Sequence, residues 1–200
     1  MTRCSAKAPH RLPSMQPVSV TLVAVDSSLH REAARLLVSE YLHWVAGIAR
    51  SNYGLSFDVD AMVHSDIEDT SKFYPPSGRF YLVEHAGGFV GVGCLKRLAP
   101  NVGEVQRMYV QPHVRGAGAG RSLVERLLQD AATLGYTTVR LESLRALAAA
   151  HNLYRSVGFR DVKPYAENSM NAYQCPEELA RYRESAVFME LSLQAKNRGA

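Results

Sequence analysis

Three glycines at alternate positions, Gly116, Gly118 and Gly120, separate an expected strand from an expected helix. The strand is GEVQRMYV, residues 103–110, and beyond the glycines apolar residues recur at helical spacing. A strand, a glycine-rich turn and a helix N-terminus surround one concavity with free backbone N–H groups and the positive end of the helix dipole. The segment therefore predicts a site for an anion, of which a diphosphate is the usual example.

Two common phosphate-binding loops are excluded by the residues around these glycines. In a P-loop for nucleoside triphosphates the last glycine precedes Lys and then Ser or Thr, whereas Gly120 precedes Arg121 and Ser122. The dinucleotide fingerprint G-x-G-x-x-G also fails, because counting from either of the first two glycines gives Arg121 or Leu123 at the sixth position. The loop must therefore belong to another class of anion site.

The remaining sequence predicts one mixed α/β domain over residues 18–193, with flexible tails at 1–17 and 194–200. The other expected strands are 18–25, 79–86, 89–98, 137–143 and 186–193, and the other expected helices are 29–47, 59–70 and 148–157. The first helix is expected to end near Gly47. Its expected buried face is made of Ala33, Leu36, Leu37, Tyr41, Trp44 and Val45.

Composition restricts the class of protein. The net charge of +4 does not indicate a nucleic-acid binder, because five of the 23 basic residues lie in the tails and leave 18 basic against 19 acidic residues elsewhere. No run of about 18 apolar residues predicts a membrane span. Three cysteines without close spacing indicate a reducing, cytoplasmic setting, and the seven histidines lack metal-site spacing. We therefore expect no nucleic-acid, membrane or metal partner.

Four sequence motifs stand in one order along the chain: EVQRMYV at 104–110, RGAGAG at 115–120, LES at 141–143 and LYRSVGF at 153–159. In this order and spacing the chain resembles the GNAT superfamily of acetyltransferases over roughly residues 18–193. The resemblance implies a central mixed, mostly antiparallel sheet flanked by helices. It also implies an N-acetyltransferase with acetyl-CoA as its co-substrate.

The resemblance further implies how the co-substrate is bound. The pyrophosphate is expected on the backbone N–H groups of residues 116–121, and the pantetheine is expected along the strand like an added strand. Arg115 and Arg121 are candidates for direct phosphate contact, and Asn152 either binds pantetheine or caps a turn. The full expected set is Met108, Tyr109, Val110, Arg115, Gly116, Ala117, Gly118, Ala119, Gly120, Arg121, Ser122 and Asn152.

Acetyl transfer to an amine requires a base for the amine proton and an acid for the departing thiolate. By the resemblance, Glu104 matches the base of some family members and Tyr154 matches the tyrosine that protonates the sulfur. Glu84 and Glu142, at other strand ends, are the alternatives to Glu104. In an unbroken strand, residues 104, 106, 108 and 110 share a face, so Glu104 is expected near the acyl end of the co-substrate.

The acceptor is expected to be the primary amine of a small molecule or peptide. Acidic residues between positions 58 and 69 suit a cationic amine, or they form a solvated helix face. The segment 163–185, with a helical turn expected at Pro176–Arg183, is longer than in similar sequences. It either covers the acceptor cleft or makes a subunit contact, which leaves a homodimer open. Two alternatives remain: a protein Nα- or lysine acetyltransferase, and a non-catalytic acyl-CoA sensor.

Overall fold

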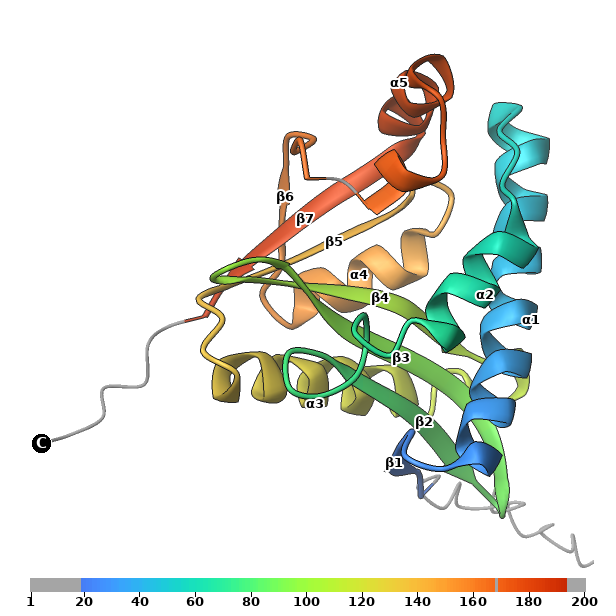
Figure 1. Cartoon of the computed structure of the whole chain (residues 1–200), viewed down its shortest axis with the longest axis vertical. Coiled ribbons are helices and arrows are strands. Elements are labelled where there is room, and N and C mark those ends of the chain that lie inside the picture. Colours follow the sequence, from blue (N-terminus) through green and yellow to red (C-terminus); the bar gives the residue numbers. More distant parts are fainter. Residues whose placement is uncertain (1–18, 168, 194–200) are drawn as a thin grey trace, which may run out of the picture.

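The computed structural model describes residues 19–167 and 169–193, so the predicted tails at 1–17 and 194–200 lie outside it (Figure 1). Its elements are β1 (Thr21–Ala24), α1 (Ser28–Tyr53), α2 (Val59–Glu68), β2 (Arg79–His85), β3 (Gly88–Ala99), β4 (Val102–Val110), η1 (Pro112–Val114), α3 (Ala119–Thr133), β5 (Thr138–Leu144), α4 (Ala148–Ser156), β6 (Arg160–Val162), η2 (Ser169–Ala172), α5 (Pro176–Ser185) and β7 (Ala186–Ser192). The predicted strands and helices are all present in the predicted order.

The strands form one seven-stranded sheet in the order β1-β2-β3-β4-β5-β7-β6. Every neighbouring pair is antiparallel except β4 and β5, which are parallel. The prediction of a mixed, mostly antiparallel sheet is therefore confirmed. The glycine loop and α3 form the crossover that a parallel pair requires.

The two parallel strands separate soon after they begin. Residues 102–104 of β4 pair with residues 138–140 of β5. Beyond these positions β4 keeps only its other neighbour, β3, and β5 keeps only β7. Figure 1 shows β5 and β7 leaving the direction of β2, β3 and β4. The separation leaves the later half of β4 without a described neighbour on its β5 side, so its backbone can bind another extended chain.

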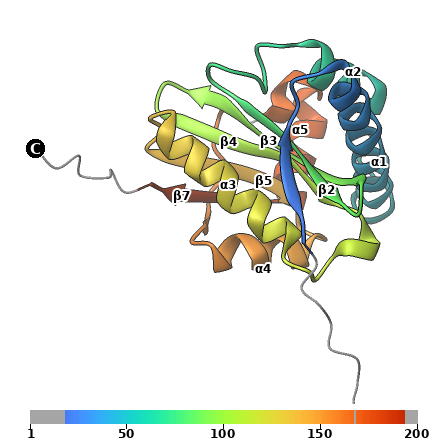
Figure 2. The ribbon, with the colours of Figure 1, turned by 90° about the horizontal axis from the view of Figure 1, so that it is seen from below.

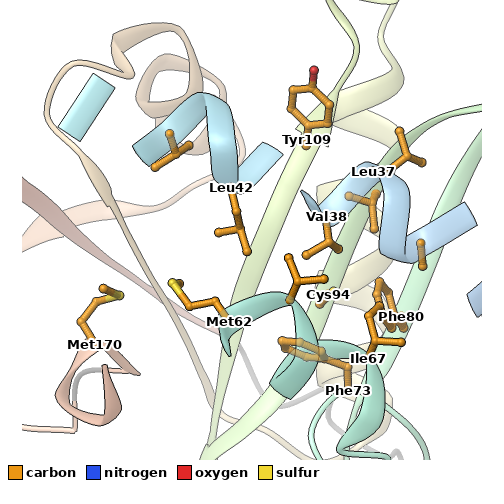
Figure 3. Packing of buried hydrophobic residues seen from close by; sticks show 14 of the residues in the cluster. Leu37, Val38, Leu42, Met62, Ile67, Phe73, Phe80, Cys94, Tyr109 and Met170 are labelled. Carbon is orange, nitrogen blue, oxygen red and sulfur yellow. The ribbon is translucent and has the colours of Figure 1, made fainter. Parts of the chain in front are cut away.

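Helices cover both faces of the sheet. Helices α1 and α2 lie on one face and α3 crosses the other (Figure 2). Buried residues of α1 and α2 pack over Phe80 and Cys94 of the sheet (Figure 3): Leu37, Val38, Leu42, Met62 and Ile67. A second cluster joins α3 to the opposite face through Leu123, Val124 and Leu127. The sheet is thus buried on both sides, and its open notch lies between β4 and β5.

Two predictions for the first helix are wrong. Helix α1 continues through Gly47 to Tyr53 and ends at Gly54, whose φ of 63° is left-handed. An interior glycine costs a helix only about 1 kcal/mol, and burial of Ala46 and Ala49 outweighs it. The predicted face is rotated as well, because Leu36 and Trp44 are 64% and 40% exposed. The buried positions are instead Ala34, Leu37, Val38, Leu42, Val45, Ala46 and Ala49.

Strand β4 contains a bulge that the sequence did not reveal. The register between β3 and β4 shifts between Val92 and Cys94, where Arg107 and Met108 occupy the space opposite the single residue Gly93. Arg107 has a φ of 55°, in the left-handed region that side chains rarely adopt. Such an insertion changes which side chains point to which face of the sheet.

The expected common face of residues 104, 106, 108 and 110 is therefore wrong. Val105, Met108 and Val110 pack on the α3 side of the sheet, whereas Tyr109 packs on the α1 side. Because successive strand residues alternate, Glu104 points away from the face of Val105 and Val110. The bulge reverses the alternation along β4, so that Val105 before it and Met108 and Val110 after it all lie on the α3 side.

Candidate active site

A groove of about 440 Å³ lies beside the end of β4, the glycine loop and α4. It brings together seven residues that the sequence predicted: Met108, Tyr109, Val110, Arg115, Gly116, Gly120 and Tyr154. Six other predicted binding residues do not line it, namely Ala117, Gly118, Ala119, Arg121, Ser122 and Asn152. The groove adjoins the later half of β4, which pairs with β3 but not with β5. On that open side an extended ligand would have backbone partners.

The three glycines of the loop are required for two different reasons. Gly116 and Gly118 have φ of 83° and 89°, a backbone conformation in which side chains are strained. At Gly120 a Cβ atom would stand 3.3 Å from Leu153 Cδ2, so this glycine allows α3 to approach α4. The first N–H groups of a helix have no partner within the helix, and no described side chain caps α3. This helix end keeps the donors that an anion needs.

The two candidate arginines differ in their surroundings. The Arg115 Nε atom donates to the Val110 carbonyl at 2.8 Å, and its guanidinium lies 5.1 Å from the centre of the Trp44 ring. Arg121 instead bonds Ser156 Oγ at 2.7 Å and Glu125 Oε1 at 3.2 Å. Arg115 thus belongs to the groove, whereas Arg121 joins α3 to α4 beside it.

Trp44 is a groove residue that the sequence analysis missed. It was expected in the buried face of α1, but it is 40% exposed and lines the groove beside Tyr109 and Arg115. The signal for Trp44 in the sequence was its place at helical spacing. This spacing does not distinguish a fully buried position from a half-exposed one at the edge of the same face.

Tyr154 lies on α4 with its ring edge-on to Phe159, the centroids 5.9 Å apart. It is buried and lines the groove. Burial raises the pKa of its phenol above the ordinary value, and the nearby Tyr41 adds to this rise. The hydroxyl therefore stays protonated at neutral pH and can donate a hydrogen bond or proton.

A second, smaller cavity of about 60 Å³ shares Leu147 with the groove. Helix α1 supplies Leu42 and Val45 to its wall, and α2 supplies Met62. The segment 163–185 supplies Ser169, Met170, Tyr173 and Tyr182, so this segment covers the cavity. Gln106, Arg107 and Glu142 bring polar groups from β4 and β5.

Comparison with known proteins identifies the family. Residues 49–159, more than half of the chain, match the Acetyltransferase (GNAT) family. The chain belongs to the GNAT acetyltransferase family. An uncharacterized N-acetyltransferase of Schizosaccharomyces pombe is 28% identical over 157 residues, which cover 77% of this chain and 91% of that protein. N-acetylaspartate synthetase of Danio rerio is 35% identical over 107 residues, 52% of this chain but 38% of the relative's own length.

Solved structures share the GNAT fold. An acetyltransferase of the GNAT family from Staphylococcus aureus superposes with a TM-score of 0.62 at 18% identity, covering 88% of this chain and all of that one. The PaiA N-acetyltransferase of Thermoplasma acidophilum, solved in complex with coenzyme A, gives 0.61 at 16% identity over 88% and 99% of the two chains. The family and these N-acetyltransferase relatives make the chain an acyl-CoA-dependent N-acetyltransferase.

Two carboxyl groups of this GNAT chain, those of Glu104 and Glu142, differ in their relation to the small cavity. Glu104 is fully buried and lines neither the groove nor the cavity. Its Oε2 accepts hydrogen bonds from Gln106 Nε2 at 2.9 Å and from Ser169 Oγ, and Lys96 Nζ lies 3.4 Å away. Glu142, the alternative on β5, lines the cavity. Glu84 lies on β2 opposite Phe89, away from both cavities.

Most of the acidic residues between positions 58 and 69 have structural partners. Asp58 caps α2 by accepting from the Ala61 N–H at 3.0 Å, and Glu68 pairs with Arg35 at 2.5 Å. Asp66 is fully buried between Lys72 and Arg107. These three carboxylates are therefore occupied, which does not favour this acidic segment as the attraction for a cationic amine.

Among residues 19–167 and 169–193, no group of three His, Cys, Asp or Glu side chains is arranged to hold a metal ion. No helix in these ranges combines the length and hydropathy needed to cross a membrane.

Proposed function

We propose that this chain transfers the acetyl group of acetyl-CoA to the primary amine of a small molecule, by direct attack within a ternary complex. In this reaction the groove holds acetyl-CoA and the small cavity holds the acceptor. The two meet at Leu147, which lines both. The acetyl carbon and the amine nitrogen would therefore meet near Tyr154.

One observation carries the choice of an amine. Gln106 Oε1 and Glu142 Oε2 are buried beside the small cavity, and neither has a hydrogen-bond donor among the described residues. Buried acceptor atoms are normally paired, because an unpaired one costs about 1–3 kcal/mol. An amine brings N–H donors and supplies the partners that these oxygens lack.

The groove fits the chemistry of coenzyme A. The uncapped N-terminus of α3 and the left-handed Gly116 and Gly118 offer backbone donors to the pyrophosphate, with Arg115 beside them. The pantetheine would lie along Met108, Tyr109 and Val110, where β4 lacks a described neighbour toward β5. The coenzyme A in the Thermoplasma acidophilum structure supports acetyl-CoA as the co-substrate.

The transfer requires two proton movements. The amine nitrogen bonds to the acetyl carbon, the carbon–sulfur bond breaks, and the electron pair leaves with the sulfur. Tyr154 gives its phenolic proton to that sulfur, a role that its burial and protonated state support. The proton of the amine passes to the carboxyl pair of Glu104 and Glu142. The Val110 N–H is the candidate donor to the developing oxyanion.

A small acceptor is favoured over a protein. The cavity of about 60 Å³ is covered by segment 163–185 through Ser169, Met170, Tyr173 and Tyr182. A protein Nα- or lysine acetyltransferase needs an open groove for its peptide, so this cover counts against that alternative. The name of the Danio rerio relative, N-acetylaspartate synthetase, adds amino acids to the acceptors worth testing.

A thiol-release assay tests the proposal. Acetyl-CoA is incubated with amino acids, polyamines, aminoglycosides and short peptides, and calorimetry measures acetyl-CoA binding alone. We expect binding together with release for one class of small amine. Release with peptides alone would favour the protein acetyltransferase. Binding without release from any amine would favour a non-catalytic sensor, and an absence of binding would contradict the whole proposal.

A further inference from the structure

Glu142 and Glu104 have different access to the small cavity. Glu142 lines it, and its Oε2 atom is buried there without a hydrogen-bond partner among the described residues. Glu104 lines neither the cavity nor the groove. An acceptor amine in this cavity would therefore contact the carboxyl group of Glu142 and not that of Glu104.

One oxygen of the Glu104 carboxylate, Oε2, is held by the protein, whereas Oε1 is buried without a hydrogen-bond partner among the described residues. Gln106, Ser169 and Lys96 all direct their polar atoms at its Oε2. These partners come from β4, η2 and β3 and fix the position of a fully buried charge. The negative charge of Glu104 acts on the ionisable groups around it, among them Glu142.

The surroundings of Glu142 favour its neutral form. Burial raises the pKa of its carboxyl to about 8, and the negative charge of Glu104 contributes to the rise. The positive charges of Lys96 and Arg107 act in the opposite direction, as does a hydrogen bond from Tyr182. The facing groups are thus Lys96 on β3, Glu104 and Arg107 on β4, Tyr182 on α5, Tyr41 on α1, and Tyr165 after β6.

We propose that Glu142, in its ionised form, is the catalytic base that takes the proton from the attacking amine, and that Glu104 is a positioning residue whose negative charge sets the pH range in which this base becomes available. The inference rests on the proposed acetyl transfer. As the carbon–nitrogen bond forms, the amine proton passes to Glu142 Oε2, while the electron pair of the broken carbon–sulfur bond takes the proton of Tyr154. Solvent then removes the proton from Glu142 and restores that of Tyr154.

Substitution of Glu142 tests the catalytic part. Wild type, Glu142→Gln and Glu142→Asp are compared with the fastest amine found in the thiol-release assay, and acetyl-CoA binding is measured by calorimetry. We expect Glu142→Gln to lower kcat on the order of 100-fold with unchanged acetyl-CoA affinity, and Glu142→Asp to recover part of the loss. Glu190→Gln is the matched control. Glu190 lies on β7 and pairs with Arg140 of β5, so this variant should retain wild-type kcat.

Titration tests the electrostatic part without any acceptor. In protein labelled with carbon-13 at glutamate carboxyls, the NMR signal that Glu142→Gln removes should titrate near pH 8. In Glu104→Gln the same signal should titrate at lower pH, because a neighbouring negative charge is gone. The base must be ionised to act, so kcat/KM should rise with pH through this pKa, and the rise should move to lower pH in Glu104→Gln.

The outcomes separate this inference from the proposed function. A wild-type protein that binds acetyl-CoA but acetylates no amine would contradict the proposed function, and this inference with it. An active wild type whose Glu142→Gln variant keeps kcat within a few-fold would overturn the inference alone. A Glu142 signal that titrates near the ordinary glutamate pKa of about 4.3 would overturn it as well.

Discussion

Single residues of this site differ in how far the sequence could predict them. Tyr154 was predicted from LYRSVGF, and it is a buried residue that lines the groove. Trp44 was not predicted, because helical spacing alone does not separate a buried position from its half-exposed neighbour. Glu104 was predicted as the base from its place in the strand, but the sequence contains no sign that Lys96, Gln106 and Ser169 enclose it.

Replacement of Tyr154 by Phe removes the proposed acid and keeps the ring that packs on Phe159. We expect kcat to fall on the order of 100-fold, because acid–base groups contribute about 10²–10⁴-fold to rate. The affinity for acetyl-CoA should stay near normal, since the groove keeps its shape. Steady-state kinetics and calorimetric titration measure the two quantities separately.

Tyr136→Phe is the matched control for that variant. Tyr136 is also a buried tyrosine, but its hydroxyl donates to the Ser77 carbonyl at 2.7 Å and lies outside the groove. Its loss should cost about 1 kcal/mol of stability and leave kcat unchanged. An unchanged kcat in Tyr154→Phe would show that the phenol is not the acid.

At the scale of elements, the order of strands and helices was predictable and the course of β4 was not. Alternation of apolar residues predicts an unbroken strand, whereas Arg107 has a left-handed φ and interrupts it. The position of Arg107 depends on its ion pair with Asp66, which lies 41 residues earlier on α2. A contact between distant segments thus decides a local backbone conformation, and a strand pattern contains no information about it.

The glycine loop allows backbone strain to be separated from ligand binding. Ala at Gly118 meets no neighbouring atom, so its cost comes from the φ of 89° and should be roughly 1–2 kcal/mol. We expect the strained loop to turn its N–H groups away and to raise the Kd for acetyl-CoA about tenfold, since a bond to a charged group contributes about 1.5–3 kcal/mol. Urea denaturation and calorimetry measure the two effects.

Gly87→Ala provides the control for the loop. Gly87 lies in the β2–β3 turn with a φ of 78°, and a Cβ there also meets nothing within 4 Å. The free energy of unfolding should fall by a similar amount, while the Kd for acetyl-CoA stays unchanged. Equal Kd values in the two variants would argue against a phosphate site at the glycine loop.

At the scale of the whole molecule, the small cavity is built from segments that lie far apart in the sequence. Lys72 bonds Tyr173 at 3.1 Å across 101 residues, and both it and Arg107 pair with the buried Asp66. This cluster joins α2 to β4 and to segment 163–185, which covers the cavity. The sequence indicated an unusual length for that segment but could not indicate where it packs.

Asp66→Asn should destabilise the molecule far more than loss of an exposed carboxylate. The change leaves Lys72 and Arg107 buried without their counter-ion, and breaking a buried pair typically costs about 3–5 kcal/mol. Asp26→Asn, at the exposed pair with His30, should cost less than about 1 kcal/mol. Urea denaturation of both variants measures the difference. Similar small losses would mean that the cluster is not what fixes segment 163–185 over the cavity, because the two cations would then have found other partners.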